Sequence, residues 1–219
     1  MANFNMHLNT ASIVSGISAA ALASVHMIDI KTSFYCFFAG VLGGILPDID
    51  HDNSIPVRII QFVISNLVAF LVVYNYLGKL KLLDIIVLWL GISIVFEIIF
   101  FFFKRLTTHR GIIHSIPMGI LFGLITILFL HNILHLNIIV SYYVGIFIFI
   151  GYLTHLILDE IYSVDLAGNK IKKSFGSALK LCSNDKRINL LIYFLIVIFF
   201  LFLPKKLEFF NLIKRLFDV

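Results

Sequence analysis

Long apolar runs are the feature that most constrains what this chain can fold into. Runs of about twenty residues recur, the length that an α-helix needs to cross the hydrocarbon core of a bilayer. Charged residues make up only 13% of the chain, whereas a soluble domain carries about 25%. The sequence therefore predicts an all-α fold, a polytopic transmembrane helical bundle embedded in a lipid bilayer.

Seven hydrophobic segments are expected, at residues 10–28, 33–46, 57–77, 82–103, 112–130, 138–158 and 188–203. The first is rich in Ser, Gly and Ala, and such small residues let helices approach closely in lipid, so we place it inside the bundle. Residues 204–219 have an apolar face and basic ends, which predicts an interfacial amphipathic tail. We treat residues 1–219 as one membrane-embedded domain.

Basic residues in the connecting loops indicate the orientation. If the seven segments alternate across the membrane, one side holds ten basic residues: Arg58, Lys104, Arg105, Arg110, Lys170, Lys172, Lys173, Lys180, Lys186 and Arg187. The other side holds the remaining seven of the chain's 17. The first side is therefore predicted to be cytoplasmic. The net charge of +5 is explained by these loops, so no nucleic-acid partner is predicted.

Histidine and aspartate converge on this same side. They come from four distant stretches: "MHLNT", "LPDIDH", "THRGIIHS" and "GYLTHLILDE". Three of these stretches, each taken alone, have an ordinary explanation, whereas "HLILD" within an apolar run is harder to dismiss. His7 would be a solvated residue near a terminus, "LPDIDH" a loop with a helix cap, and "THRGIIHS" a basic flanking loop. Ionisable groups at membrane depth are costly and usually functional, so the four stretches together predict a metal site.

The spacing within two of these stretches suits metal binding. His155 and Asp159 are four residues apart, so they share one helix face and can hold one ion. Asp48 and His51 are three apart, and Pro47 can begin a helical turn there. Asp50 would then bridge a second ion or orient a ligand.

The stretch "THRGIIHS" adds two further histidines and a cation. His109 and His114 are five apart, which does not fit one straight helix face, but Gly111 permits a turn between them. Arg110 between them is a permanent cation suited to bidentate contact with phosphate. The predicted metal ligands are His7, Asp48, Asp50, His51, His109, His114, His155 and Asp159, and the predicted catalytic residues are Asp52 and Arg110.

The ordered motifs "LPDIDH", "HRGIIHS" and "GYLTHLILD" resemble those of the YdjM-type membrane-bound metal-dependent hydrolases, known as LexA-regulated or LexA-binding inner-membrane proteins. The resemblance covers residues 1–165 and implies a multi-pass protein of the bacterial inner membrane with hydrolase activity. His155 and Asp159 are also similar to a helical His-x-x-x-acid pair of zinc-dependent phospholipase C. Asp84 and Glu97 have no histidine nearby and are expected to be an interfacial cap and a helix–helix polar contact.

The leading functional hypothesis is hydrolysis of a lipid-linked phosphoester at the membrane surface. Imidazole and carboxylate ligands suit a divalent ion, zinc above all, with manganese or magnesium as alternatives. Eight ligands suffice for one or two ions, Arg110 would hold phosphate, and Asp52 would be a general base or orient a ligand. The alternatives are a metal-ion or proton transporter, and a regulatory membrane protein stabilised by metal. No His-Glu-x-x-His or Gly-x-Ser-x-Gly motif is present, which disfavours a standard metalloprotease or serine hydrolase.

The predicted orientation can be tested by labelling single introduced cysteines. A cysteine in loop 105–110 should react with a membrane-impermeant reagent from the cytoplasmic side only, and one in loop 131–137 from the opposite side only. Labelling of both loops from one side would contradict the alternation of seven segments. Reversed labelling would keep the cluster but move it to the periplasmic face.

Overall fold

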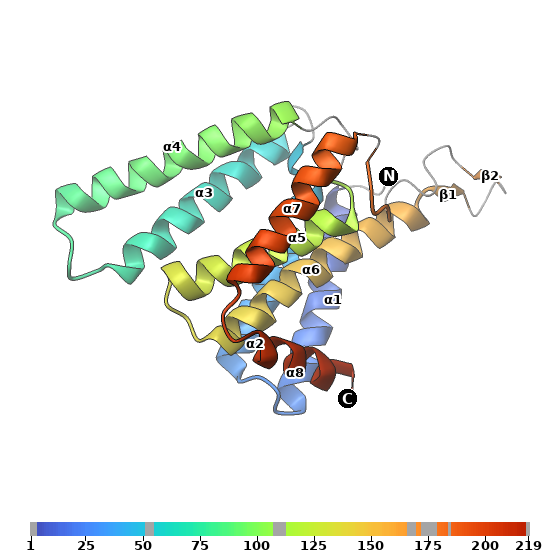
Figure 1. Cartoon of the computed structure of the whole chain (residues 1–219), viewed down its shortest axis with the longest axis horizontal. Helices are drawn as coiled ribbons and strands as arrows, with labels where there is room; N and C mark the ends of the chain where they lie inside the picture. The colour runs from blue at the N-terminus through green and yellow to red at the C-terminus, as the bar shows by residue number, and fades with distance from the viewer. Residues whose placement is uncertain are drawn as a thin grey trace. The chain divides into compact units, whose positions relative to one another are not determined.

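The computed structural model describes residues 4–50, 55–106, 113–165, 170–171, 179–183 and 185–217. The chain forms two compact units, one of residues 1–47 with 112–219 and the other of residues 48–111 (Figure 1). The predicted metal-binding stretches are divided between the two units.

The first unit is a bundle of helices. Its elements are α1 (Phe4–Ser24), α2 (Ile30–Gly43), α5 (Ile116–Leu128), the π-helical turn η2 (Phe129–Ile133), α6 (Ile138–Ile161), α7 (Lys186–Phe202) and α8 (Lys206–Phe217). A two-residue strand, β1 (Val164–Asp165), pairs antiparallel with β2 (Lys170–Ile171) after α6. The 3₁₀ helix η1 (Leu46–Asp50) leads from α2 into the second unit, which contains α3 (Ile55–Asn75) and α4 (Leu82–Leu106).

Polar residues fix the first turns of three helices. Asp29 caps α2 by accepting a hydrogen bond from the Thr32 amide, 3.0 Å away, and the hydrogen bonds that Thr32 donates lower the pKa of the Asp29 carboxyl. Asn137 and Asp185 cap α6 and α7 in the same way. Each cap satisfies amide groups that the first helical turn leaves without a partner.

Small residues let α1, α2 and α6 pack with their backbones close together. A Cβ atom at Gly151 of α6 would collide with the backbone carbonyl of Gly40 on α2, and one at Gly43 would collide with the backbone of Ile148. Ser15 of α1 lies against Gly40. Close approach through small residues is how helices gain packing energy inside lipid, where lipid tails are as apolar as the side chains.

The first turns of α6 are held in place by contacts with the last two helices, α7 and α8. Tyr142 donates a hydrogen bond from its hydroxyl to the carbonyl of Pro204, between α7 and α8. Its ring also contacts Phe209 of α8, with the centroids 5.0 Å apart. Helices α7 and α8 meet at a bend of 103°. The amphipathic tail predicted for residues 204–219 is thus a helix, α8, packed on the bundle.

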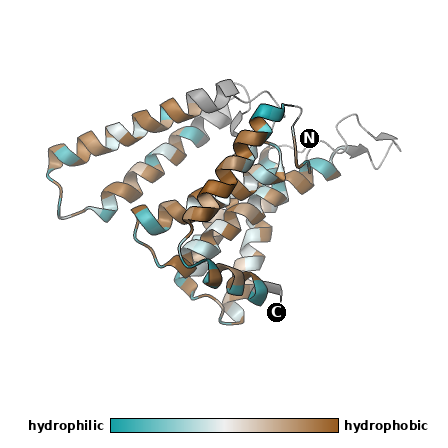
Figure 2. Ribbon diagram, viewed as in Figure 1, coloured by the Kyte–Doolittle hydropathy of each residue, from teal (hydrophilic) through white to brown (hydrophobic). Residues whose placement is uncertain are grey.

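A helix occupies each of the seven predicted segments, but fewer meet the requirements for crossing a membrane. Within the described residues, four spans are long and apolar enough: Ile30–Asp48, Leu82–Phe100, Ile116–Ile133 and Ile138–Ile161. A fifth is possible if the bent pair α7 and α8 is one span. In Figure 2, hydrophobic residues, coloured brown, run along much of α4 and α7. The count of seven spanning segments is therefore not confirmed. Helix α1 is rich in small and polar residues, the apolar stretch Gln61–Asn75 of α3 is shorter than a span, and α7 counts only together with α8.

The second unit is a pair of helices. On α3, the buried side chains Gln61, Ser65, Ala69 and Val73 recur every four residues and so form one stripe. The indole N–H of Trp89 on α4 donates to the Asn66 side chain of α3, 3.1 Å away. This polar contact within an apolar helix pair fixes the register of α4 on α3.

Substitution of Gly151 by Ala should destabilise the protein, because the added methyl group would push α6 away from the α2 backbone. The expected loss is about 1–3 kcal/mol in the free energy of unfolding, the usual result of overpacking. Thermal unfolding in detergent measures it. Gly91→Ala in α4 is the matched control, since nothing lies within 4 Å of a Cβ atom there. Equal effects of the two variants would contradict the close helix crossing.

Candidate metal centre

His7 belongs to the second turn of α1, because the helix begins at Phe4 and not near residue 10 as predicted. His7, Ala11, Ser15 and Ala19 are the buried residues of this helix, and their spacing of four places them on one face. His7 is 3% exposed. The small residues that follow bring this face against α2, so His7 is carried into the bundle and is not a solvated terminal residue.

His155 and Asp159 lie one turn apart near the end of α6, and both are buried. The Nδ1 atom of His155 lies 2.8 Å from the carbonyl oxygen of Gly44, just after α2. A carbonyl oxygen only accepts, so Nδ1 donates the hydrogen bond. Nε2 of His155 therefore faces Asp159, 3.7 Å from its Oδ2 atom.

His114 reaches the same place from the segment before α5. The Ser115 amide donates to the Ile113 carbonyl, 2.8 Å away, which closes a tight turn around His114. The hydroxyl of Tyr152 on α6 donates to that same carbonyl. Ile116 also donates its amide to the Lys180 carbonyl, 3.1 Å away, which ties this turn to the segment before α7.

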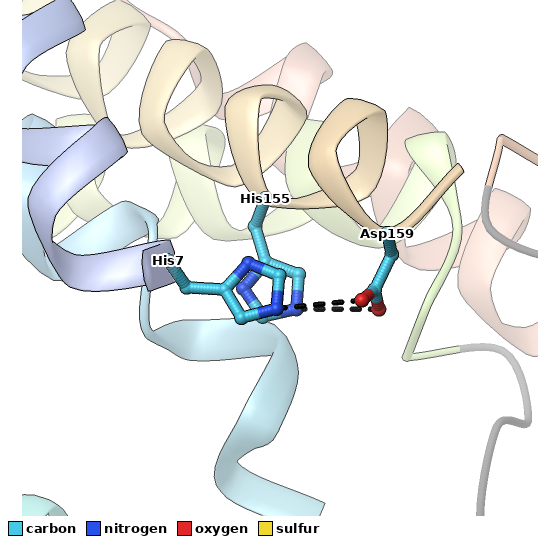
Figure 3. A group of neighbouring side chains, drawn as sticks. All are labelled: His7, His155 and Asp159. Atoms are coloured by element: carbon cyan, nitrogen blue, oxygen red, sulfur yellow. Dashed lines mark ion pairs between the residues drawn. The ribbon is translucent and has the colours of Figure 1, made fainter. Parts of the chain in front are cut away.

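All three histidine side chains lie near the Asp159 carboxylate, and His7, His155 and Asp159 are drawn in Figure 3. Nε2 of His7 lies 3.3 Å from Oδ1 of Asp159, and Nε2 of His114 lies 4.0 Å from Oδ2. The His7 and His155 rings stack with centroids 3.7 Å apart, and both rings point toward Asp159 (Figure 3). One ligand atom from each of His7, His155 and Asp159 lies within 4.8 Å of the other two.

These distances are longer than charge-assisted hydrogen bonds and are compatible with a metal ion between the side chains. Charge-assisted N–H···O bonds measure about 2.7–2.9 Å, shorter than any of the three distances to Asp159. Two atoms that each lie about 2.0–2.2 Å from one zinc ion can be up to about 4.4 Å apart, and all three distances fall below that limit. The donor set of imidazole nitrogens and a carboxylate oxygen is also the one that zinc prefers.

The electrostatics of the cluster also call for a positive charge. Because Nδ1 of His155 donates to Gly44, Nε2 of the neutral ring presents a lone pair toward the Asp159 carboxylate. Among the described residues, none forms a hydrogen bond with the buried Nδ1 of His7. Among the described side chains, no Lys or Arg forms an ion pair with Asp159. A metal cation could bind both the lone pair on Nε2 of His155 and the carboxylate of Asp159.

The other predicted site residues belong to the second unit, residues 48–111. Asp48 is half-buried on η1 at the first position of the second unit. Asp50 ends η1, and its side chain is outside the described part of the structure. His51, Asp52, His109 and Arg110 lie outside the described residues. Their roles as ligands or catalytic residues stay predictions.

The remaining histidines lie at the opposite helix ends. His26 follows α1, and His131 and His135 lie between the start of η2 and α6. Nδ1 of His131 donates to the carbonyl of Leu136, 2.9 Å away. His7 is near the start of α1 and His155 near the end of α6, so the predicted separation of the two groups of histidines holds within the first unit.

Two positioning residues were missed by the sequence analysis. Gly44 orients His155 through its carbonyl, and Tyr152 supports the turn at His114 through its hydroxyl. Neither is a histidine or a carboxylate, so a search for those side chains does not find them. The signals were present: Gly44 directly precedes "ILPDIDH", and Tyr152 lies three residues before His155 on α6.

The sequence profile of the YdjM inner membrane protein family matches residues 6–203, which include all four residues of the cluster. The chain belongs to the YdjM inner membrane protein family. No curated protein and no solved structure matches it. The resemblance drawn from the three motifs is thereby confirmed.

Membership of the YdjM family, together with the apolar helices, makes this chain a multi-pass inner membrane protein. The family match extends through α7, well beyond the three motifs, so it includes most of the helices that build the bundle. The family name states where its members are located, the inner membrane, but it does not name a reaction. Any chemistry must therefore be argued from the cluster itself.

Proposed function

We propose that this protein is a membrane-bound metal-dependent hydrolase that acts on a lipid-linked phosphoester. The observation that carries the proposal is the buried cluster of His7, His114, His155 and Asp159, whose nitrogen and oxygen atoms converge at one end of the bundle. Four buried ionisable side chains inside a membrane protein are costly unless they have a function. The resemblance of the motifs to metal-dependent hydrolases supports the same assignment.

His7, His155 and Asp159 would hold the metal, with His114 as a fourth ligand or as a contact to the substrate. Zinc suits this donor set, and manganese or magnesium are alternatives. A bound divalent ion lowers the pKa of a coordinated water and polarises the bond to be broken. The hydrogen bond from His155 to Gly44 keeps Nε2 available as the ligand atom, as backbone carbonyls do for other metal-binding histidines.

The position of the cluster supports a lipid-linked substrate. Asp159 lies in the last turn of α6, and His7 in the second turn of α1, so both lie near helix ends. A lipid whose tail stays in the bilayer would present its head group at this depth. Arg110 would contact the phosphate as a bidentate cation, and Asp48, Asp50, His51 and His109 would complete the ligands; these five assignments rest on the sequence motifs alone.

The same location weighs against a transporter. A transport pathway needs ionisable groups deep in the membrane or at both ends. Within the described part of the first unit, the clustered groups lie at one end, and His131 at the other end donates to a backbone carbonyl.

Replacing His155 or Asp159 by Ala should remove bound divalent metal from the purified protein. Thermal stability in excess metal should fall too, because an ion that binds only the folded state contributes about 2.7 kcal/mol at a hundredfold excess over Kd. Metal content per chain measures the first effect, and unfolding with and without chelator measures the second. His131→Ala is the matched control and should leave both unchanged. Equal metal loss in this control would contradict a site at the His155 end.

Hydrolysis is tested with the full-length protein in lipid vesicles that contain a panel of lipid phosphoesters. Release of phosphate or head group should require the metal and stop with chelator. Asp159→Asn should lose activity, because a neutral amide is a poorer ligand than a carboxylate. Arg110→Lys should lower turnover but keep the metal, since lysine lacks the bidentate fork. Turnover that chelator does not affect would refute the proposal, as would a metal-loaded protein that cleaves nothing and moves ions across the vesicle membrane.

A further inference from the structure

Helix α7 contributes no side chain to the metal cluster, but a short series of hydrogen bonds connects it to His114. The connection runs through residues 179–183, the described segment that precedes α7. Lys180 of this segment pairs with the turn that carries His114. All of these residues belong to the first unit, the same unit as the cluster.

His114 is the one cluster residue that does not lie on a helix. His7 and His155 are carried by α1 and α6, whose packing fixes them, whereas α5 begins only at Ile116. His114 is nevertheless 3% exposed, and its Nε2 atom lies 4.0 Å from Oδ2 of Asp159. A side chain on a non-helical turn depends on other contacts of its backbone to keep one direction.

The backbone around His114 is held on both sides. Before it, the carbonyl of Ile113 accepts a hydrogen bond from the Tyr152 hydroxyl. After it, the Ile116 amide donates to the Lys180 carbonyl, 3.1 Å away, as part of a short parallel bridge. The direction of the His114 side chain therefore depends on Lys180 keeping its place.

Asn189 in the first turn of α7 fixes the segment that contains Lys180. Its side-chain oxygen accepts from the amide and from the hydroxyl of Ser183, 2.8 and 2.9 Å away, and its side-chain nitrogen donates to the Ser183 carbonyl, 2.7 Å away. Tyr193, one turn further along α7, donates its hydroxyl to the Leu181 carbonyl, 3.0 Å away. Asn189 thus bonds both backbone groups of Ser183, three residues after Lys180.

Helix α7 is itself fixed in the bundle. Asp185 caps it by accepting from the amides of Arg187 and Ile188, 2.8 and 3.4 Å away. The helix packs against α5 (Figure 1), and its Ile192 side chain is buried. Because the two helices pack together, the segments that lead into them lie side by side, and Asn189 holds one of these segments against the other.

We propose that Asn189 is a positioning residue for His114: it holds residues 179–183 against the turn before α5 and so keeps the His114 imidazole directed at Asp159 as the fourth metal ligand. The assignment rests on the proposed function, because it is the metal that gives the direction of His114 its importance. Residues that orient a metal ligand without touching the metal contribute to its affinity, since a misdirected ligand is lost from the site.

Hydrogen exchange tests the link between Asn189 and His114 without any metal. In the full-length protein with chelator, Asn189→Leu should speed exchange of the Ile116 amide roughly three- to tenfold, the effect of weakening about one hydrogen bond. Amides in the middle of α6 should keep their rates. Asn189→Asp, which retains the acceptor oxygen for the Ser183 amide, should restore part of the protection.

Asn211→Leu is the matched control, because Asn211 is an exposed residue of α8 and not of the segment around His114. It should leave the exchange of the Ile116 amide unchanged. An unchanged rate in Asn189→Leu would overturn the proposal. Equal acceleration of the Ile116 and α6 amides would also overturn it, because that result means general destabilisation.

Cobalt(II) binding tests the consequence for the metal centre, since the visible absorption of this ion reports its coordination. Asn189→Leu should weaken cobalt binding roughly three- to tenfold and change the absorption in the same direction as His114→Ala. The double variant should bind no more weakly than His114→Ala, because both changes act through one ligand. Additive losses, or a spectrum that His114→Ala does not alter, would overturn the proposal. A native chain that binds no cobalt would refute the proposed metal-dependent function, and hydrogen exchange would still decide whether Asn189 positions His114.

Discussion

The close crossing of α2 and α6 is the contact on which the rest of the first unit depends. It exists because Gly40, Gly43 and Gly151 place no side chain between the two backbones. The same crossing brings the Gly44 carbonyl to 2.8 Å from Nδ1 of His155. The packing of the helices and the orientation of a candidate ligand therefore have one cause. A methyl group at this crossing would disturb both.

The cluster shows how a membrane bundle can keep several ionisable groups buried. Asp159 receives His7 from α1, His155 from its own helix and His114 from the turn before α5. Each element is fixed by a separate contact, such as the packing of small residues along α1 or the Tyr152 hydroxyl at Ile113. Because the three histidines come from different elements, their convergence exists only in the folded bundle. A metal ion bound there would link folding to ligand binding.

The two units differ in how their apolar helices are used. Of the 24 residues of α6, 13 are buried within the protein, whereas none of the residues Leu82–Phe100 of α4 is buried. Helix α6 therefore organises the bundle of the first unit, whereas within its own unit α4 is only partly covered by α3. A carboxylate means different things in these two settings. Asp159 is surrounded by three histidines of its own chain, whereas no described residue forms a hydrogen bond or an ion pair with Glu97.

Sequence alone determined the helical membrane class, the approximate position of each helix and the family, because apolar length and ordered motifs are local properties of the chain. It also identified His155 and Asp159 as a pair, since a spacing of four residues fixes a shared helix face. The sequence did not determine how many helices span the membrane, because packing against other helices can hold a short or polar helix such as α1 in the bundle. Only the tertiary structure showed that His7 is buried, that Gly44 orients His155, and that His7 and His114 meet at Asp159. His7 contacts Asp159 and Gly44 contacts His155, and the members of each pair are more than a hundred positions apart in the chain. No local sequence pattern records contacts over such separations.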